Sequence, residues 1–440
     1  MKKSTGNEIK LGLLTLMLGA FCGAVIWLFL RLLGICTGLI WDTIPAKAGF
    51  KYLPVLICAA GGLAAGLVRK KYGDYPEELH QVLGKVRKEK HYDYSKMAVI
   101  LVCAFIPLVF GASVGPEAGL TGIIAGLCYW VGDNVKYAKE HAEEYSEIGA
   151  AVTLGSLFHV PLFGIFAVEE DPEDGSALPS VPKASKLLLY GLSTGAAYLV
   201  MRCLNSLLGN ASLGFPSFDY AEPSAADFAM MLIYIPAGMI LFMVFGYSEK
   251  LTGMAAGKMP AILSETVCGA VIGLMAVLAP MVIFSGEEQM GELPETFMRY
   301  APAALIGICL LKLMMTAFCI QFGMKGGHFF PLIFACSCMG FAAAMLVFGN
   351  AAGITDQAVL TGHAVFAAAV ITASTLGAQM KQPLAVSMLL LICFPLRFVL
   401  WIFIAAALAG RLAGCKKNGS EERKEEEQLH GSQSRRKGDR

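Results

Sequence analysis

The stretch Gly111-Ala-Ser-Val-Gly-Pro-Glu-Ala-Gly119 decides the fold, because one apolar segment, 97–114, ends there and another, 118–131, begins. Glu117 is therefore an acidic side chain at a helix start inside apolar sequence. Carboxylates are costly at membrane depth and are usually functional where they occur. The first turn of a helix also leaves backbone N–H groups unpaired, and these attract anions. We predict that Glu117 occupies an anion pocket and leaves it when protonated or displaced; a plain helix cap is the structural alternative.

The composition of the whole chain indicates a membrane protein. Of the 440 residues, 56% are apolar and 16% are charged, whereas soluble domains have about 45–50% and about 25%. Several apolar segments are shorter than the roughly 20 residues of a clean span, or contain Gly and Pro. We expect an all-α, multi-span fold with broken and re-entrant helices that line a transport site. The segments lie near 11–40, 53–68, 97–114, 118–131, 148–168, 186–208, 229–247, 262–285, 298–321, 329–348, 358–380 and 382–410.

Other classes of function are disfavoured by the same composition. The net charge of +1 gives no basic face for a nucleic acid. The 13 cysteines lie in or beside apolar segments, so we expect no disulfide framework, no metal site and no cofactor. The seven histidines include no pair four residues apart, and this disfavours an intramembrane metalloenzyme.

The charges of the loops predict the topology. The connection 69–96 is rich in Lys and Arg and is expected in the cytoplasm, whereas 209–228 has neither residue and is expected outside. The first half then begins inside and the second half outside, which is the arrangement of an inverted repeat. We expect a multi-pass protein of the cell membrane, embedded in the lipid bilayer, with both termini cytoplasmic. The predicted parts are a cytoplasmic N-terminus (1–10), a first transmembrane repeat (11–208), an extracellular linker (209–228), a second transmembrane repeat (229–412) and a disordered cytoplasmic tail (413–440).

Two further stretches carry candidate chemistry. In Lys325-Gly-Gly-His-Phe-Phe-Pro331, the glycines permit close backbone approach and aim the following N–H groups at a ligand, although an ordinary helix–helix turn is the alternative. In Phe158 to Asp171, an apolar helix ends in three acids on the predicted cytoplasmic side. One of these acids could load or release protons, while a solvated helix end is the simpler interpretation.

Together these stretches resemble the CLC family of chloride channels and proton-coupled chloride antiporters, and in particular a bacterial branch with Gly-Pro-Glu in the gate motif. Gly115-Pro-Glu-Ala-Gly119 is similar to the family's Gly-Arg/Lys-Glu-Gly-Pro motif. Gly326-Gly-His-Phe-Phe-Pro331 is similar to its Gly-Gly-x-Phe-x-Pro motif, and Pro161 to Asp171 to its Pro-Leu-x-Gly-x-x-Phe helix with two terminal glutamates. The resemblance implies an antiparallel inverted repeat in each subunit and a homodimer with one ion pathway per subunit.

The resemblance also implies roles for individual residues. Glu117 is similar to the gating glutamate, and Asp171, with Glu170 just before it, corresponds to the cytoplasmic proton-relay acid. The loop Tyr72-Gly-Asp-Tyr-Pro76 stands where the family has Gly-Ser-Gly-Ile-Pro, so Gly73 replaces a serine that touches the anion. The predicted anion-binding residues are Gly115, Ala118, Gly119, Gly327, His328, Phe329, Phe330, Gly73 and Asp74.

The expected function is transport of chloride or another halide, by proton-coupled exchange through Glu117. Two alternatives of the same fold stay open, a passive chloride channel and a fluoride/proton antiporter. The expected partners are the halide, protons, lipid and a second copy of the chain.

Overall fold

The computed structural model describes most of the chain and builds it from helices. The described residues are 5–45, 49–77, 93–134, 148, 151–152, 154–156, 158, 160–170, 184–211, 216–218 and 223–414. Asp171, parts of the predicted linker 209–228 and residues 415–440 of the predicted tail lie outside them. Nine helices within the described part are long and apolar enough to cross a membrane. The predicted all-α, multi-span class is therefore confirmed.

The helices fall into two successive sets. The first set comprises α1 (Thr5–Gly38), α3 (Leu53–Tyr72), α5 (Met97–Val109), α6 (Glu117–Asn134), α8 (Pro161–Glu169) and α9 (Ala184–Leu208). The second comprises α10 (Ala225–Ala256), α11 (Ala261–Leu278), α12 (Glu287–Thr296), α13 (Pro302–Gln321), α14 (Phe329–Ala344), α15 (Gln357–Met380), α16 (Pro383–Leu390) and a last helical segment, Leu396–Gly414.

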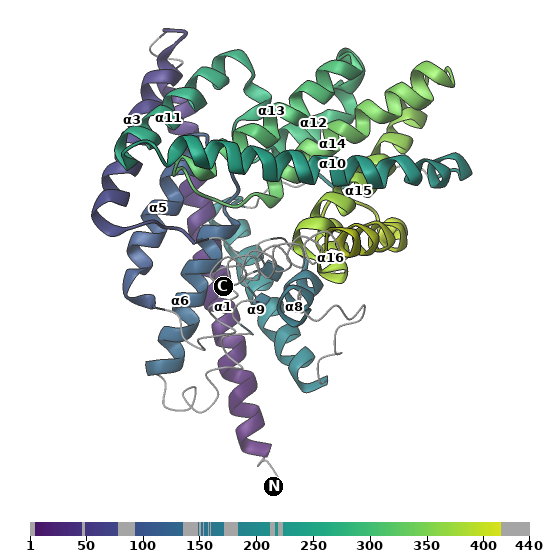
Figure 1. Cartoon of the computed structure of the whole chain (residues 1–440). Helices are drawn as coiled ribbons and strands as arrows, with labels where there is room; N and C mark the ends of the chain where they lie inside the picture. The colour runs from purple at the N-terminus through teal and green to yellow at the C-terminus, as the bar shows by residue number, and fades with distance from the viewer. Residues whose placement is uncertain are drawn as a thin grey trace, which may run out of the picture.

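Helices at matching places in the two sets meet each other. In Figure 1, α3 lies beside α11 and α8 lies near α16, and both pairs are packed together. Gly115 and Gly327, which precede α6 and α14, form an antiparallel bridge. Pairwise meetings of this kind are expected of two similar halves in opposite orientation, and they bring both helix starts to one place.

Several helices are too short to cross a bilayer. Helix α8 has 9 residues, α12 has 10 and α16 has 8, against the roughly 20 that a span needs. Helices α6 and α14 begin at breaks in the chain, and the residues of both breaks are largely buried. Non-helical backbone at membrane depth is tolerated only inside protein or around a cavity, and these breaks satisfy that condition.

One predicted segment is divided in the structure. The apolar run 382–410 is not continuous, because α16 ends at Leu390 and the next helical segment begins only at Leu396. Pro395 lies directly before that new start. Proline has no N–H to donate and disfavours helical geometry in the residue before it, so the two helices are separate.

The centre of the molecule is formed by α14 and α15. Nearly all of α15 from Leu360 to Ala378 is buried, and many of these residues are alanines. A Cβ at Gly340 of α14 would overlap the backbone of Ala368 of α15, so the two helices are in direct contact. Large apolar side chains of the outer helices are exposed, such as Leu207 and Leu232. This distribution suits a protein surrounded by hydrocarbon.

Small residues allow α3 and α11 to touch, and this contact gives a stability prediction. A Cβ at Gly269 of α11 would overlap the carbonyl oxygen of Cys58 of α3. We expect Gly269→Ala to destabilise the protein by about 1–3 kcal/mol, as overpacking does. Gly307→Ala is the control, because the space around Gly307 is open and alanine favours a helix by about 1 kcal/mol. Thermal unfolding in detergent should show opposite shifts, and equal shifts would contradict this packing.

Candidate functional site

Glu117, the first residue of α6, lies at the N-terminus of α14. Its Oε1 accepts a hydrogen bond from the N–H of Phe329 at 2.9 Å. The side chain is 1% exposed, and Oε2 has no hydrogen-bond partner among the described residues. A carboxylate thus occupies the place where a helix N-terminus attracts an anion.

Two backbone hydrogen bonds hold the helix starts together. The N–H of Gly115 donates to the carbonyl of Gly327 at 2.7 Å, and the N–H of Gly327 donates back at 2.7 Å. Neither of these two N–H groups is open to a ligand, and the anion-binding role of Gly115 and Gly327 stays a prediction. Their contribution is space, because a Cβ at either position would overlap the carboxyl group of Glu117.

The first turns of both helices provide the remaining donors. The earliest intrahelical bond of α6 runs from Leu120 to Pro116, and that of α14 from Leu332 to His328. The N–H groups of Ala118, Gly119, Phe329 and Phe330 precede these bonds, and the N–H of Phe329 donates to Oε1 of Glu117. The side chain of His328 contacts α15, where its Nε2 lies 2.8 Å from Nε2 of Gln379.

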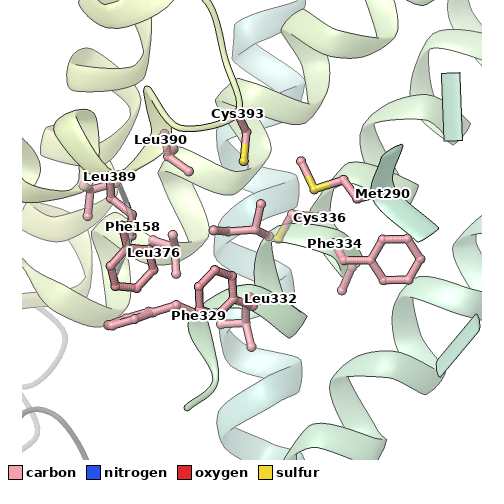
Figure 2. Close-up of a cluster of buried hydrophobic side chains, with 14 of the residues drawn as sticks. Phe158, Met290, Phe329, Leu332, Phe334, Cys336, Leu376, Leu389, Leu390 and Cys393 are labelled. Carbon is pink, nitrogen blue, oxygen red and sulfur yellow. The ribbon is translucent and has the colours of Figure 1, made fainter. Parts of the chain in front are cut away.

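An aromatic cluster closes the pocket and joins two of the predicted stretches. The ring of Phe158 stacks on Phe330, with centroids 5.0 Å apart, and lies edge-on to Phe329 at 6.4 Å. Figure 2 shows Phe158 beside Phe329, with Leu376 and Leu389 nearby. A Cβ on Gly115 would meet both the Phe330 ring and the carboxyl group of Glu117, so the cluster borders this buried carboxyl group. Such low-dielectric surroundings strengthen its hydrogen bond with the N–H of Phe329.

Glu170 is a second carboxylate bound at a helix start. It is 5% exposed, and its oxygens accept hydrogen bonds from the N–H groups of Ala385 (2.9 Å) and Leu384 (3.3 Å) at the beginning of α16. Glu170 lies outside the nine candidate spans; burial raises its pKa above the usual value, and the two N–H donors oppose that rise. Glu170 is thus a buried acid that can hold a proton, while Asp171 is outside the described residues.

The predicted anion-binding residues Gly73 and Asp74 directly follow the end of α3. Gly73 has φ of +103°, and its N–H donates to the carbonyl of Arg69 at the end of α3. Asp74 pairs with Nε of Arg69 at 2.7 Å and with Nζ of Lys325 at 2.6 Å. The contacts found for Asp74 within the described part of the chain do not include Glu117. Arg69 and Lys325 bind the Asp74 side chain, and the anion-binding role of Gly73 and Asp74 stays a prediction.

Among the buried charged residues, two that lie inside apolar segments were not singled out from the sequence. Glu265 of α11 and Lys312 of α13 are both fully buried. Nζ of Lys312 donates to the carbonyl oxygens of Val282, Ile283 and Phe284. Both could have been found from the sequence, because Glu265 and Lys312 are charged residues inside apolar segments. The same criterion selected Glu117.

Comparison with curated proteins finds a chloride channel protein as a relative. Chloride channel protein CLC-e of Arabidopsis thaliana is 22% identical over 355 residues, which cover 74% of this chain and 48% of the relative. The chain therefore spans about half the length of this curated relative.

Solved structures share the fold at low sequence identity. A CLC-type fluoride/proton antiporter superimposes with a TM-score of 0.69 at 19% identity, covering 94% of this chain and 97% of that chain. A slow cyanobacterial Cl⁻/H⁺ antiporter gives 0.70 at 18% identity, covering 93% and 94%. A eukaryotic CLC transporter gives 0.67 at 17% identity, covering 92% and 72%.

The family model described as voltage gated chloride channel matches residues 60–414. This range includes both helix starts, the aromatic cluster and Glu170. The chain belongs to the voltage-gated chloride channel, or CLC, family.

Proposed function

We propose that this protein moves a small inorganic anion, chloride in the first place, across a membrane in exchange for protons. The observation that carries the proposal is the hydrogen bond from the N–H of Phe329 to Oε1 of Glu117. A carboxylate at this position is a tethered substitute for a free anion, because both satisfy the same electropositive helix start.

Exchange follows from this competition. An ionised Glu117 fills the pocket and keeps the anion out. A protonated Glu117 has lost the charge that favours the helix start, so an anion can take its place. Each cycle then moves anions and protons in opposite directions, with Glu117 as the carrier of the proton.

Glu170 is the proposed proton donor and acceptor at the other end of the route. Glu170 is buried at the start of α16 and directly follows α8 in the sequence. Helix α8 begins three residues after Phe158, which belongs to the aromatic cluster. By resemblance to the family, the adjacent Asp171 shares this role. We also propose that the protein is not an enzyme, that it forms a homodimer in the cell membrane, and that its termini are cytoplasmic.

Purified protein in liposomes tests the proposal. A chloride gradient should drive protons uphill, and the pH change should stop when chloride flux is blocked. Chloride flux without uphill proton movement would identify a passive channel.

A fluoride/proton antiporter is the second candidate. Gly73 provides no hydroxyl where the family has a serine, and one structural neighbour is a CLC-type fluoride/proton antiporter. The same assay, with fluoride replacing chloride, separates the two anions: faster fluoride flux with slow chloride flux would favour this candidate.

Glu170→Gln is expected to slow proton flux on the order of 100-fold, the size of a typical general acid–base contribution, while anion flux continues. The amide oxygen can still accept from Ala385, so the fold should survive, but the side chain can no longer carry a proton. Parallel recordings of pH and anion flux measure the ratio of proton flux to anion flux.

Glu169→Gln is the matched control, because Glu169 is the neighbouring acid and accepts a hydrogen bond from Tyr190 instead. It should leave the ratio of proton to anion flux near the wild-type value. Equal losses in both variants would count against a relay role for Glu170.

A further inference from the structure

Helix α12 carries a buried carboxyl group that the proposed exchange does not use. The glutamates of this helix are Glu287, Glu288, Glu292 and Glu295. Glu287 is buried, with 8% of its surface exposed, whereas the other three are exposed. Within the described residues, Oε1 of Glu287 has no hydrogen-bond partner. Leaving a buried carboxyl oxygen without a partner is costly, so this side chain needs a functional explanation.

Glu287 lies near the pocket of Glu117, beside the next turn of α14. A Cβ on Gly286, the residue before Glu287, would meet the side chain of Phe334. The ring of Phe330 borders the carboxyl group of Glu117 in the same way. Phe330 and Phe334 are four residues apart, so they share one face of α14 and are about 6 Å apart along its axis. The two acids therefore lie beside successive turns of one helix face.

The charges around Glu287 connect it to Glu117. Glu287 lies outside the candidate spans found in the described part of the chain. Burial raises the pKa of its carboxyl group to about 8, and the negative charge of Glu117 adds to that rise. The other groups that interact with this carboxyl group are the Ser285 hydroxyl, Glu288, Lys312 and the Cys393 thiol. Neighbouring carboxyl groups do not both ionise readily, so Glu117 and Glu287 favour sharing one proton.

Lys312 fixes the segment that leads to Glu287. Its ammonium group has three N–H donors, and Nζ donates to the three carbonyl oxygens of residues 282–284. Lys312 therefore offsets the charge of Glu287 without binding its free oxygen. The N–H of Phe284 donates to the carbonyl of Gly111, in the loop before α6, at 3.0 Å. These bonds tie the segment before α12 to the segment before α6.

The sequence predicts the side of the membrane that α12 faces. The connection 286–297 contains no Lys or Arg, so it is expected on the outer side, opposite the basic connection 69–96. Glu170 is the proposed proton donor and acceptor on the cytoplasmic side. The outer end of the proton route has no assigned residue, and Glu287 is a buried acid at that end.

We propose that Glu287 transfers protons between Glu117 and the outer side of the membrane, and that Lys312 is its positioning residue. The O–H bond of a protonated Glu287 breaks, and an O–H bond forms on the carboxylate of Glu117. Among the described residues no hydrogen bond joins the two carboxyl groups directly, so a bridging water accepts one proton as it gives up another. The inference rests on the proposed function, because it assigns the outer end of the same proton route.

Glu287→Gln is expected to slow proton flux in liposomes on the order of 100-fold, the size of a typical general acid–base contribution, while anion flux continues. The amide has nearly the shape of the carboxyl group but cannot carry the proton. Glu292→Gln changes an exposed acid of the same helix and should leave the ratio of proton flux to anion flux near the wild-type value. Glu287→Asp keeps a carboxyl group and should restore most of the proton flux.

The pH dependence separates proton transfer from a structural role. In the wild-type protein, with equal pH on both sides, proton flux should fall in a step as the pH rises through about 8, because Glu287 loses its proton there. This step should be absent from Glu287→Gln. Lys312→Gln removes a positive charge and thereby raises the pKa of Glu287, so the step should move to higher pH. Lys312→Arg keeps the charge and should keep the step in place.

The outcomes distinguish this inference from the proposed function. Absence of anion-driven proton flux in the wild-type protein would overturn the proposed function. If wild-type flux is coupled, an unchanged ratio in Glu287→Gln, or equal losses of proton and anion flux, would overturn only the role of Glu287. Thermal unfolding in detergent shows whether Glu287→Gln folds. If it does not fold, the pH series of the wild type and of Glu287→Asp decides: a step near pH 8 that moves in Glu287→Asp supports the role, and no step, or an unmoved one, overturns it.

Discussion

Glu117→Ala is expected to abolish proton movement driven by an anion gradient, while anion flux continues. Within the described residues, the carboxyl group of Glu117 is the only titratable group found to accept a hydrogen bond from the N–H of Phe329. Its removal leaves the helix start to the anion alone and leaves no carrier for the proton at this position. Simultaneous recording of pH and anion concentration in liposomes measures both fluxes.

Two comparisons sharpen this expectation. Glu117→Gln has nearly the shape of the native side chain but cannot ionise, so it should also lose coupling. Glu292→Ala removes an exposed acid of α12 and should retain coupling. Proton flux that stays tightly coupled in Glu117→Ala would show that Glu117 is not the proton carrier.

Gly327→Ala is expected to reduce coupling strongly although Glu117 itself is unchanged. A Cβ at this position would overlap the carboxyl group of Glu117, whose flexible side chain must then leave the pocket. Displacement of a reacting group by about 1 Å can cost on the order of 100-fold in rate, and we expect a loss of that size in the ratio of proton to anion flux.

A double variant tests whether this loss passes through Glu117. In the Glu117→Ala background, Gly327→Ala should cause little further change, because residues in contact act non-additively. Gly307→Ala, in open space on α13, should leave coupling unchanged. Independent, additive losses would contradict the assignment of Gly327 as the wall of the carboxylate pocket.

Much of the fold was predictable because hydrophobic length is a strong constraint in a membrane. The apolar runs correspond to helices such as α3, α11 and α15, and two of the short helices, α8 and α16, begin at a proline. The meeting of Glu117 with the 326–331 stretch also followed from sequence, through the helix-start argument and the family motifs. The functional roles of these residues stay predictions.

Other features of the site depend on contacts between residues that are far apart in the sequence, and these contacts could not be predicted from it. Asp74 and Lys325 are 251 positions apart, and no local pattern indicates that they pair. The ion pairs of Asp74 with Arg69 and Lys325 were not predictable from the sequence, and the role of Gly73 and Asp74 beside the anion stays a prediction. Glu170 was predictable as an acid at a helix end, but its burial against the start of α16 was not.

The central claim is that Glu117 and a free anion occupy the same place in turn. Crystals of the wild-type protein and of Glu117→Ala, both grown in bromide, test it through the anomalous scattering of the ion. The account predicts a bromide peak within hydrogen-bond distance of the Phe329 nitrogen in the variant, where Oε1 lies in the wild type. A variant pocket without bromide, or a wild-type pocket that holds both bromide and the carboxylate on Phe329, would contradict it.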